Sequence, residues 1–403
     1  MKVVEINMMA HGSSGKIMLQ IAEVARKNGI QAWSAYPDWS ITKDKPVENR
    51  IFIGNRYARL LHYYLGKITG FNGCFSYFST KNFIRKLKKI KPDIIHLHNI
   101  HGGIINLPLL FKYIKKNDIK VVWTLHDCWS FTGQCAHFVL ANCDKWKTGC
   151  HHCPAYKEYN PTLVDRTKKM WKLKKKWFTG IKDVIIVPVS QWLGDLVKQS
   201  YLNEYPIRVL ISGIDLSVFK PTDSDFRQKY NLQDKKIILG VALPWNNKKG
   251  LDVFIELSKR LTDEYQIVLV GTDDKVDAML PKNIISIHRT QNQTELAEIY
   301  TASDVFFNPT REDTSPTVNM ESLACGLPVI TFKTGGSPES LDEKTGIVLE
   351  ENTVDCAEKT LIEYFANPYL KAEDCINRAK TFDHNDRFNE YIKLYRELEN
   401  KTE

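Results

Sequence analysis

Short apolar segments rich in Val and Ile alternate with longer amphipathic segments along most of this chain, and this alternation constrains the fold more than any other feature. Short apolar, β-branched runs are typical of buried strands, and the amphipathic stretches between them predict helices. Strands that alternate with helices form a parallel sheet wrapped by helices. A first set of strands is expected at residues 3–7, 31–36, 94–98, 121–125 and 184–189. A second set is expected at residues 236–241, 266–271, 284–287, 305–308 and 329–332.

A polar stretch around residues 223–234 separates the two sets of strands. The 403 residues exceed the usual size of one domain, so the sequence predicts two doubly wound α/β domains, at residues 1–212 and 213–384. The last segment, residues 385–403, has apolar side chains at spacings of three and four, which predicts a helix with one apolar stripe that packs back on the N-terminal domain. The stripe consists of Phe388, Tyr391, Ile392, Leu394, Tyr395 and Leu398.

Composition excludes several classes of protein. Hydrophobic residues at 43% and charged residues at 26% are typical of folded globular chains and exclude disordered, collagen-like and coiled-coil proteins. The net charge of +9 favours an anionic partner such as a phosphate-bearing substrate, a nucleic acid or a lipid surface. The first residues include Lys2, Glu5 and Asn7, which does not fit the apolar part of a signal peptide, and the sequence contains no run of 18 apolar residues. A cytoplasmic protein is therefore expected.

The loop and helix that follow the strand at residues 305–308 carry the clearest pattern for a ligand site, because ligands of open α/β sheets bind beyond the carboxyl ends of strands. A helix is expected to start near Pro316 or Thr317 and to run to Cys325, with Gly326 ending it. Its unpaired N–H groups can hold a diphosphate, and Glu321 can accept two hydrogen bonds from a ribose diol. The alternative is an ordinary core helix with an acid near its start.

Residues 313–329 resemble the signature of the retaining nucleotide-sugar glycosyltransferases of family 4, which have the GT-B fold. That signature has two acids separated by seven residues, followed by Ala-Cys-Gly-x-Pro-Val. Asp313 and Glu321 have this separation, and residues 324–329 complete the pattern. The family usually has Glu at the first position, and Glu312 is adjacent, so either acid is a candidate for contact with the donor sugar. The resemblance implies a donor site that includes Glu312, Asp313, Thr317, Val318 and Glu321, in a domain that faces the other across a cleft.

Other segments are similar to the same family. Residues 212–221 resemble its interdomain segment. Residues 334–339, which follow the predicted strand at 329–332, and Lys249-Gly250, which resembles the Lys-Gly pair that binds phosphate, are also similar to the family. The family usually has an Arg about five residues before that Lys, where this chain has Pro244. The resemblance therefore implies that Lys249 neutralises the diphosphate, with Lys248 or Arg311 as further cations. Taken alone, Lys-Lys-Gly is more often a solvated helix start.

A glycine turn that contains Gly12, Ser13 and Gly15 follows the first strand and opens a helix. It differs from a P-loop, which would require Gly in place of Ala10 and a hydroxyl residue in place of Ile17. We expect this turn to let the backbone approach an anionic donor or an acceptor hydroxyl.

Two histidines, His98 and His126, stand at or directly after predicted strands. A lone His there is more often a hydrogen-bonded structural residue. In the family, a His at the end of the fourth strand, which His126 matches, lies near the donor sugar. The resemblance therefore implies His126 and Asp313 as the catalytic residues, with His126 donating to a sugar hydroxyl and Asp127 orienting the ring.

Residues 128–153 form a cysteine-rich insert in the N-terminal domain. Cys135, Cys143, Cys150 and Cys153 have the spacing Cys-x7-Cys-x6-Cys-x2-Cys, which can supply four thiolates to a structural zinc ion. Because this spacing is irregular for a zinc ribbon, reduced and packed cysteines are an equal alternative. The resemblance implies that catalysis requires no metal cofactor, since basic side chains and a helix end stabilise the leaving diphosphate.

Residues 166–178 carry seven positive charges and place Met170, Leu173 and Trp177 on one helical stripe. These apolar residues can face the core with the lysines in water. Alternatively, the segment binds an anionic membrane surface, with its tryptophans, Trp171 among them, dipping into the lipid. Residues 81–91 form a second basic segment.

The family resemblance implies a retaining glycosyltransferase that moves a sugar from a nucleoside diphosphate sugar to a glycan acceptor, such as a lipid-linked precursor of a surface polysaccharide. A peripheral place on the inner face of the cytoplasmic membrane fits such an acceptor. A nucleotide-sugar 2-epimerase of GT-B fold is the alternative enzyme. A zinc-containing nucleic-acid-binding protein is the alternative outside enzymes. It is not favoured, because the basic residues are dispersed and no nucleic-acid-binding motif occurs, so no nucleic-acid partner is expected.

Overall fold

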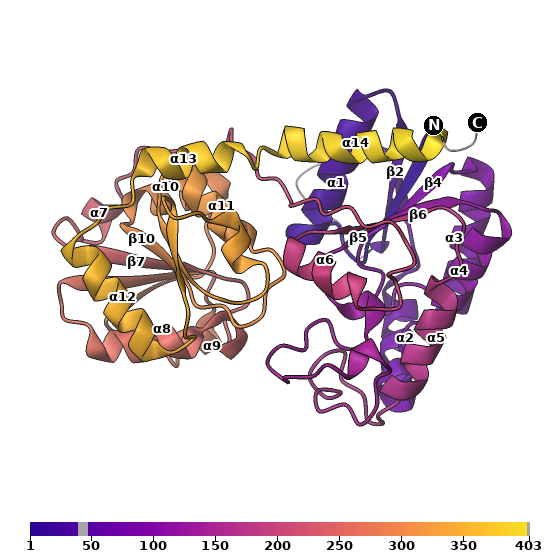
Figure 1. The fold of residues 1–403 in the computed structure, drawn as a ribbon, viewed down its shortest axis with the longest axis horizontal. Coiled ribbons are helices and arrows are strands. Elements are labelled where there is room, and N and C mark those ends of the chain that lie inside the picture. Colours follow the sequence, from indigo (N-terminus) through magenta and orange to yellow (C-terminus); the bar gives the residue numbers. More distant parts are fainter. Residues whose placement is uncertain (39–46, 401–403) are drawn as a thin grey trace. The chain divides into compact units, whose positions relative to one another are not determined.

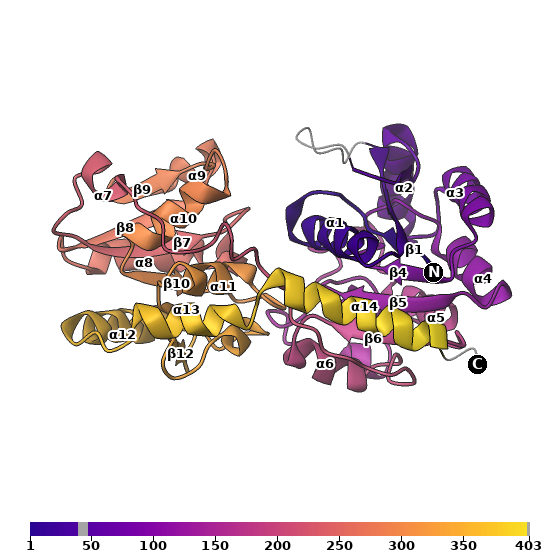
Figure 2. The ribbon, with the colours of Figure 1, turned by 90° about the horizontal axis from the view of Figure 1, so that it is seen from above.

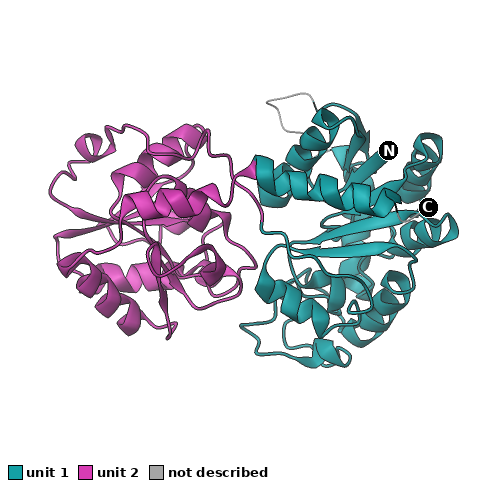
Figure 3. Ribbon diagram, turned by 45° about the horizontal axis from the view of Figure 1, so that its top comes forward, with its two compact units in different colours: residues 1–211, 385–403 teal, residues 212–384 magenta. Residues whose placement is uncertain are grey.

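The computed structural model describes residues 1–38 and 47–400, which fold into two compact units (Figure 3). Unit 1 consists of Met1–Ile211 together with Asn385–Glu403, and unit 2 consists of Ser212–His384. All ten strands expected from the sequence occur, each with ends within one residue of the expected ones. Each unit contains one parallel sheet of six strands.

The sheet of unit 1 has the strand order β3-β2-β1-β4-β5-β6. Alternate residues of its strands point to opposite faces: Val3 belongs to the core cluster that includes side chains of α1 and of α14 (His384–Asn400), and Val4 belongs to the cluster that includes side chains of α3 and α4. Figure 1 shows these helices around the sheet. The strands are β1 (Lys2–Ile6), β2 (Gln31–Tyr36), β3 (Arg50–Phe52), β4 (Ile94–Leu97), β5 (Lys120–Leu125) and β6 (Val184–Pro188). The helices are α1 (Gly12–Lys27), α2 (Arg56–Thr69), α3 (Tyr77–Ile90), α4 (Leu107–Lys116), α5 (Thr167–Phe178) and α6 (Gln191–Lys198).

The sheet of unit 2 has the strand order β12-β11-β10-β7-β8-β9. Its strands are β7 (Lys236–Val241), β8 (Tyr265–Val270), β9 (Ile284–Ile287), β10 (Val305–Asn308), β11 (Val329–Phe332) and β12 (Gly346–Leu349). Its longer helices are α8 (Leu251–Arg260), α10 (Gln293–Ala302), α11 (Thr317–Ala324), α12 (Val354–Ala366) and α13 (Ala372–Lys380). Its short helices are α7 (Phe226–Lys229), α9 (Asp274–Asp277) and the 3-10 turns η4 (Asn247–Lys249) and η5 (Ser337–Ser340).

Two edge strands, β3 and β12, were not expected from the sequence. β3 is three residues long with Arg50 exposed, and only Leu349 of β12 is buried. Neither strand therefore has the continuous apolar run of an interior strand. Because β3 precedes it, the strand before His126 is the fifth and not the fourth, which corrects the strand count assumed in the family comparison of that histidine.

The last helix, α14 (His384–Asn400), packs on the sheet of unit 1 (Figure 2). Its six buried side chains are those of the expected apolar stripe. Two of them also carry polar contacts to the sheet. Tyr395 Oη lies 2.6 Å from His96 Nδ1, and Thr124 Oγ1 donates to Tyr391 Oη at 3.2 Å.

The structure corrects two expectations about the side chains of helix α5. Trp171 is buried and its indole Nε1 donates to the backbone oxygen of Trp146 at 2.9 Å, so the expectation that Trp171 dips into lipid is wrong. Lys174 is also fully buried. Its Nζ donates to the backbone oxygen of Trp129 and lies 3.6 Å from the centroid of the Trp129 ring. Burial lowers the pKa of Lys174 to about 7.

Among the described helices, none combines the length and the apolar character needed to cross a membrane.

In both sheets the chain order reverses direction at the first strand, between β1 and β4 in unit 1 and between β7 and β10 in unit 2. Such a switch point leaves a crevice at the carboxyl ends of the strands, because the connecting loops leave in opposite directions. The residues that follow these four strands are therefore the first place to look for a site.

Candidate functional site

Two ion pairs connect the loops that follow β7 and β10 in unit 2. Lys249 Nζ pairs with Asp313 Oδ2, and Lys248 Nζ lies 3.2 Å from Glu312 Oε2. The Glu312 side chain is only 2% exposed, whereas that of Asp313 is 18% exposed. The structure thus brings together Lys249, Glu312 and Asp313, as the sequence pattern predicted, and makes Asp313 the more accessible of the two acids.

Glycines allow the loops at this switch point to approach closely. Gly250 has a φ of +74°, and a Cβ on it would lie 2.5 Å from the backbone oxygen of Pro309. Gly335 has a φ of +56°, and its Cβ would lie 1.8 Å from the backbone oxygen of Asp313. Side chains at either position would push the loop after β10 away, so these glycines hold Asp313 in its place.

Helix α11 starts directly after this loop and carries three of the residues predicted to bind the nucleotide-sugar donor. Thr317 and Val318 form its partly exposed first positions, and Glu321 lies one turn further along. Glu321 Oε2 accepts a hydrogen bond from Tyr300 Oη at 3.5 Å. The helix start is held by Asn319, which sequence reasoning missed: its Nδ2 donates to Ser337 O at 3.0 Å and its Oδ1 accepts from Asn308 Nδ2 at 2.7 Å.

Arg311, which was a candidate for neutralising the diphosphate, forms an ion pair with Asp252 of the same unit. Its two terminal nitrogens donate to the two carboxylate oxygens of Asp252 at 2.7 and 2.8 Å. A bidentate pair of this kind fixes the guanidinium plane. Lys248 and Lys249 are therefore the cations of this loop cluster that pair with the predicted donor-binding acids.

The glycine turn of unit 1 lies beside the β1/β4 switch point. Gly12 and Ser13 are exposed at the start of α1, whereas Gly15 is buried, and a Cβ there would lie 2.6 Å from the carbonyl carbon of Ala10. The turn is tied to the strand end by Asn7, whose Nδ2 donates to Ser14 Oγ at 3.4 Å. Gly15 thus serves the packing of the helix, and the exposed positions are those available to a ligand.

His126 follows β5 and lies at the end of a buried polar network. Its Nε2 is 3.1 Å from His98 Nδ1, and the other ring nitrogen of His98 is 3.2 Å from Glu5 Oε2. His96 Nδ1 is 3.8 Å from the same oxygen. Burial lowers the pKa of His126 to about 4, so its imidazole is neutral at pH 7 and has one N–H to donate. The polar network was not foreseen as a whole, although His98 was a candidate.

Asp127 contacts a different histidine from the one predicted. Its Oδ2 lies 3.0 Å from His101 Nε2, and its Oδ1 accepts from the backbone N–H of Trp129 at 2.8 Å. Burial opposes ionisation, but these two contacts hold the pKa of Asp127 at about 2. His98, His101, His126, Asp127 and Trp129 line one small pocket at the carboxyl ends of β4 and β5. The sequence contains one indication of the role of His101: it lies three residues after His98, in the loop that follows β4.

The four cysteines of the predicted zinc site lie in one insert of unit 1. Cys135 and Cys150 are buried, and Cys150 Sγ accepts from the backbone N–H of Gly133 at 3.1 Å. Burial raises the pKa of both thiols to about 12, so that both are neutral at pH 7 unless a metal ion binds. Among the described residues, the group of three or more ligand atoms within 4.8 Å of one another is that of Glu5, His96 and His98, and it does not include these cysteines. The zinc site and the packed thiols both stay predictions, which metal analysis tests.

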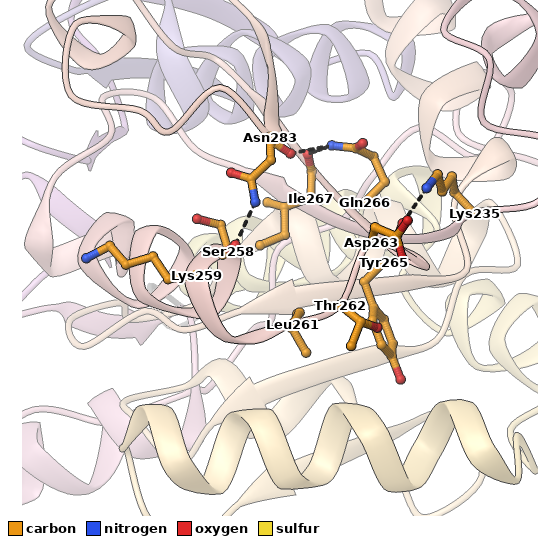
Figure 4. A pocket seen from close by; sticks show the side chains of 10 residues that line it. All are labelled: Lys235, Ser258, Lys259, Leu261, Thr262, Asp263, Tyr265, Gln266, Ile267 and Asn283. Atoms are coloured by element: carbon orange, nitrogen blue, oxygen red, sulfur yellow. Dashed lines mark hydrogen bonds between the residues drawn. The ribbon is translucent and has the colours of Figure 1, made fainter.

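A separate pocket of unit 2 lies at the other end of its strands, near the amino ends of β7 and β8 (Figure 4). Its polar groups bond to one another: Asn283 Nδ2 donates to Ser258 O at 2.6 Å, and Gln266 Nε2 donates to Asn283 O at 2.8 Å. This pocket contains none of the predicted site residues.

Comparison with known proteins gives two matching family models. Residues 15–218 match the model described as Glycosyltransferase Family 4, and residues 222–382 match the model described as Glycosyl transferases group 1. The chain is 26% identical over 272 residues to WcaC of Escherichia coli K12, whose name assigns it to colanic acid biosynthesis, and this match covers 65% of each chain. The chain spans 46–65% of the length of the first three curated relatives.

Among solved structures, similarity extends over almost the whole chain. Sucrose-phosphate synthase from Thermosynechococcus elongatus has a TM-score of 0.73 at 16% identity, with 98% of both chains covered. Anabaena Alr3699/HepE in complex with UDP has a TM-score of 0.67 at 14% identity, with 98% of this chain and all of that one covered. Together with the two parallel sheets, these likenesses confirm the expected GT-B fold.

Proposed function

Because the chain belongs to the family 4 glycosyltransferases, we propose that it transfers a sugar from a nucleoside diphosphate sugar to a glycan acceptor. The single observation that carries this proposal is the pairing of Lys249 with Asp313 beside the start of α11, at the β7/β10 switch point. An ammonium group and the free N–H groups of a helix start are suited to bind a diphosphate. The Anabaena neighbour in complex with UDP supports a nucleotide donor.

The charged residues of this loop cluster and of α11 have separate parts in this proposal. Lys249 moves from the Asp313 carboxylate to the diphosphate when the donor binds, and Asp313 then accepts hydrogen bonds from the donor sugar. Glu321 accepts two hydrogen bonds from the ribose diol. Glu312 stays with Lys248, because its side chain is almost fully buried.

We propose a retaining reaction. The acceptor oxygen forms a bond to the anomeric carbon on the face from which the diphosphate leaves, and the bond from that carbon to the diphosphate oxygen breaks. The leaving diphosphate takes up the proton of the acceptor hydroxyl. The protein contributes positioning and electrostatic stabilisation, with the neutral His126 donating to a hydroxyl of the transferred sugar.

The proposed acceptor is a lipid-linked precursor of a surface polysaccharide, and the protein acts at the inner face of the cytoplasmic membrane. The name of WcaC, which refers to colanic acid biosynthesis, supports a polysaccharide product. No finding favours the 2-epimerase or the nucleic-acid-binding protein.

Thermal unfolding in the presence of a panel of nucleotide sugars tests the donor proposal. A donor at 100 times its dissociation constant stabilises the protein by ~2.7 kcal/mol, and Lys249→Ala removes this stabilisation. Lys259→Ala is the matched control, because Lys259 is an exposed residue of α8 that pairs with Glu256. If no nucleotide sugar stabilises the wild type at millimolar concentration, the donor proposal fails.

A further inference from the structure

Helix α2 presents an apolar stripe to solvent. Tyr57, Leu61, Tyr64 and Ile68 are 81%, 62%, 56% and 56% exposed. Their spacings of four, three and four place them on one face of the helix. Surface helices of globular proteins bury such a stripe against their core. The stripe of α2 faces solvent, so packing within this chain does not explain it.

The opposite face of α2 fixes this orientation. His62 and Gly66 are its buried residues. The ring of His62 lies 2.7 Å from Ser76 Oγ and accepts from the backbone N–H of Gly73 at 3.0 Å. A Cβ on Gly66 would lie 2.4 Å from Asn72 Oδ1, so the helix sits directly on the segment before α3. Rotation of the stripe toward the protein would break these contacts.

The first turn of α3, which directly follows Ser76 and so lies close to α2 in the fold, adds two exposed aromatic side chains, Tyr77 and Phe78. Helices α2 and α3 contain no acidic residue. Their basic residues are Arg56, Arg59, Lys67, Lys81, Arg85, Lys86, Lys88 and Lys89.

We propose that α2 and the first turn of α3 bind the surface of an anionic lipid bilayer. Apolar and aromatic side chains on one face, with Lys and Arg beside them and no acid, are typical of helices that lie in a membrane interface. The aromatic and Leu side chains enter the boundary between headgroups and acyl chains, and the basic side chains contact lipid phosphates. A second copy of this chain is the poorer partner, because a symmetric contact would bring two acid-free, basic surfaces together.

This surface replaces residues 166–178 as the membrane contact and goes beyond the proposed transfer reaction, since it includes none of the donor or sugar-binding residues. Its test is therefore independent of whether the protein transfers a sugar.

Co-sedimentation of the full chain with phosphatidylcholine vesicles, with and without 30% phosphatidylglycerol, tests the proposal. We expect binding to the anionic vesicles and at least tenfold weaker binding to the neutral ones. The variant Tyr57→Ser/Leu61→Ser/Tyr64→Ser should bind anionic vesicles at least tenfold more weakly, and Arg56→Glu/Arg59→Glu should reduce binding in a salt-dependent way. All five positions are on α2, and the three changed to Ser are exposed, so the fold should persist, which circular dichroism checks.

Two matched controls locate the contact. Lys172→Glu/Lys175→Glu changes exposed charges on α5, and Ile362→Ser/Tyr369→Ser removes exposed apolar side chains from unit 2. Both should bind vesicles as the wild type does. Absence of vesicle binding, equal binding by the Ser variant, or loss in the α5 control alone would overturn the proposal. A dimer that sedimentation equilibrium detects in the wild type and not in the Ser variant would show that a second copy covers this face and would also overturn it.

Discussion

The Nδ1 atom of His98 lies 3.1 Å from the Nε2 atom of His126, and this contact links the proposed sugar-binding histidine to the interior of unit 1. The second nitrogen of His98 is 3.2 Å from the buried Glu5 carboxyl. Burial raises the pKa of Glu5, which favours a protonated carboxyl that donates to His98 Nε2, so the hydrogen of His98 is on Nδ1 and is donated to His126 Nε2. The one hydrogen of the neutral His126 is then on Nδ1, where it is available to the sugar. The orientation of His126 therefore depends on two residues that we expect never to touch substrate.

Replacement of these residues should separate turnover from donor binding. His126→Ala should lower kcat by about tenfold, which corresponds to the free energy of the one hydrogen bond that it donates to the sugar, with the donor Kd unchanged. Glu5→Gln should lower kcat less, because it removes only the bias on the His98 tautomer. Calorimetry of donor binding and steady-state kinetics check both. A loss of nucleotide affinity with normal kcat would assign His126 to the nucleotide instead.

Glu321→Ala should weaken donor binding by more than about 100-fold, because two charge-assisted hydrogen bonds to the ribose diol are lost. The fold should stay intact, since Glu321 is partly exposed and its bond to Tyr300 is long, at 3.5 Å. Isothermal titration with the donor measures the effect, and Glu363→Ala, an exposed acid on α12, is the control. An unchanged Kd would exclude Glu321 from the donor site.

The neighbouring acids Glu312 and Asp313 should differ in their effects on activity and stability. Asp313→Asn should reduce kcat strongly, because Asp313 is the more accessible carboxylate and pairs with Lys249. Glu312→Gln should mainly lower stability, since it leaves Lys248 without its buried partner. Turnover and chemical unfolding of both variants check this. Equal, mild effects on turnover would remove both acids from the site.

Metal analysis decides between the two interpretations of the cysteine insert. A zinc site predicts about one zinc per chain, with loss of the metal and lower stability in Cys150→Ser. Cys356→Ser in unit 2 is the control, because that cysteine lies outside the insert. A metal-free preparation that unfolds at the same temperature with and without a chelator would establish packed, reduced thiols.

Much of the fold follows from the sequence because interior strands and the stripe of α14 have strong periodicities. The polar network of unit 1 does not, because Glu5 and His96 become neighbours only through the register of β1 and β4. Helix α2 shows a different limit. The spacing of Tyr57, Leu61 and Tyr64 predicts an amphipathic helix, but periodicity cannot tell whether the stripe faces the core or the solvent.

The candidate site of unit 2 was predictable where side-chain chemistry follows from a local motif. Lys249, Asp313 and Glu321 belong to short patterns that fix both spacing and residue type. Asn319 and the Arg311–Asp252 pair were missed because their roles depend on partners from other loops, and nothing in the sequence identifies those partners.

The stereochemistry of the product distinguishes a retaining transferase from an inverting transferase and from an epimerase. The protein is incubated with the nucleotide sugar that stabilises it and with a glycan acceptor, and NMR follows the anomeric proton of the product. We expect a new glycosidic bond with the anomeric configuration of the donor, and no such product with Lys249→Ala. An inverted linkage would contradict the retaining reaction, and a 2-epimerised sugar formed without acceptor would contradict the transferase itself.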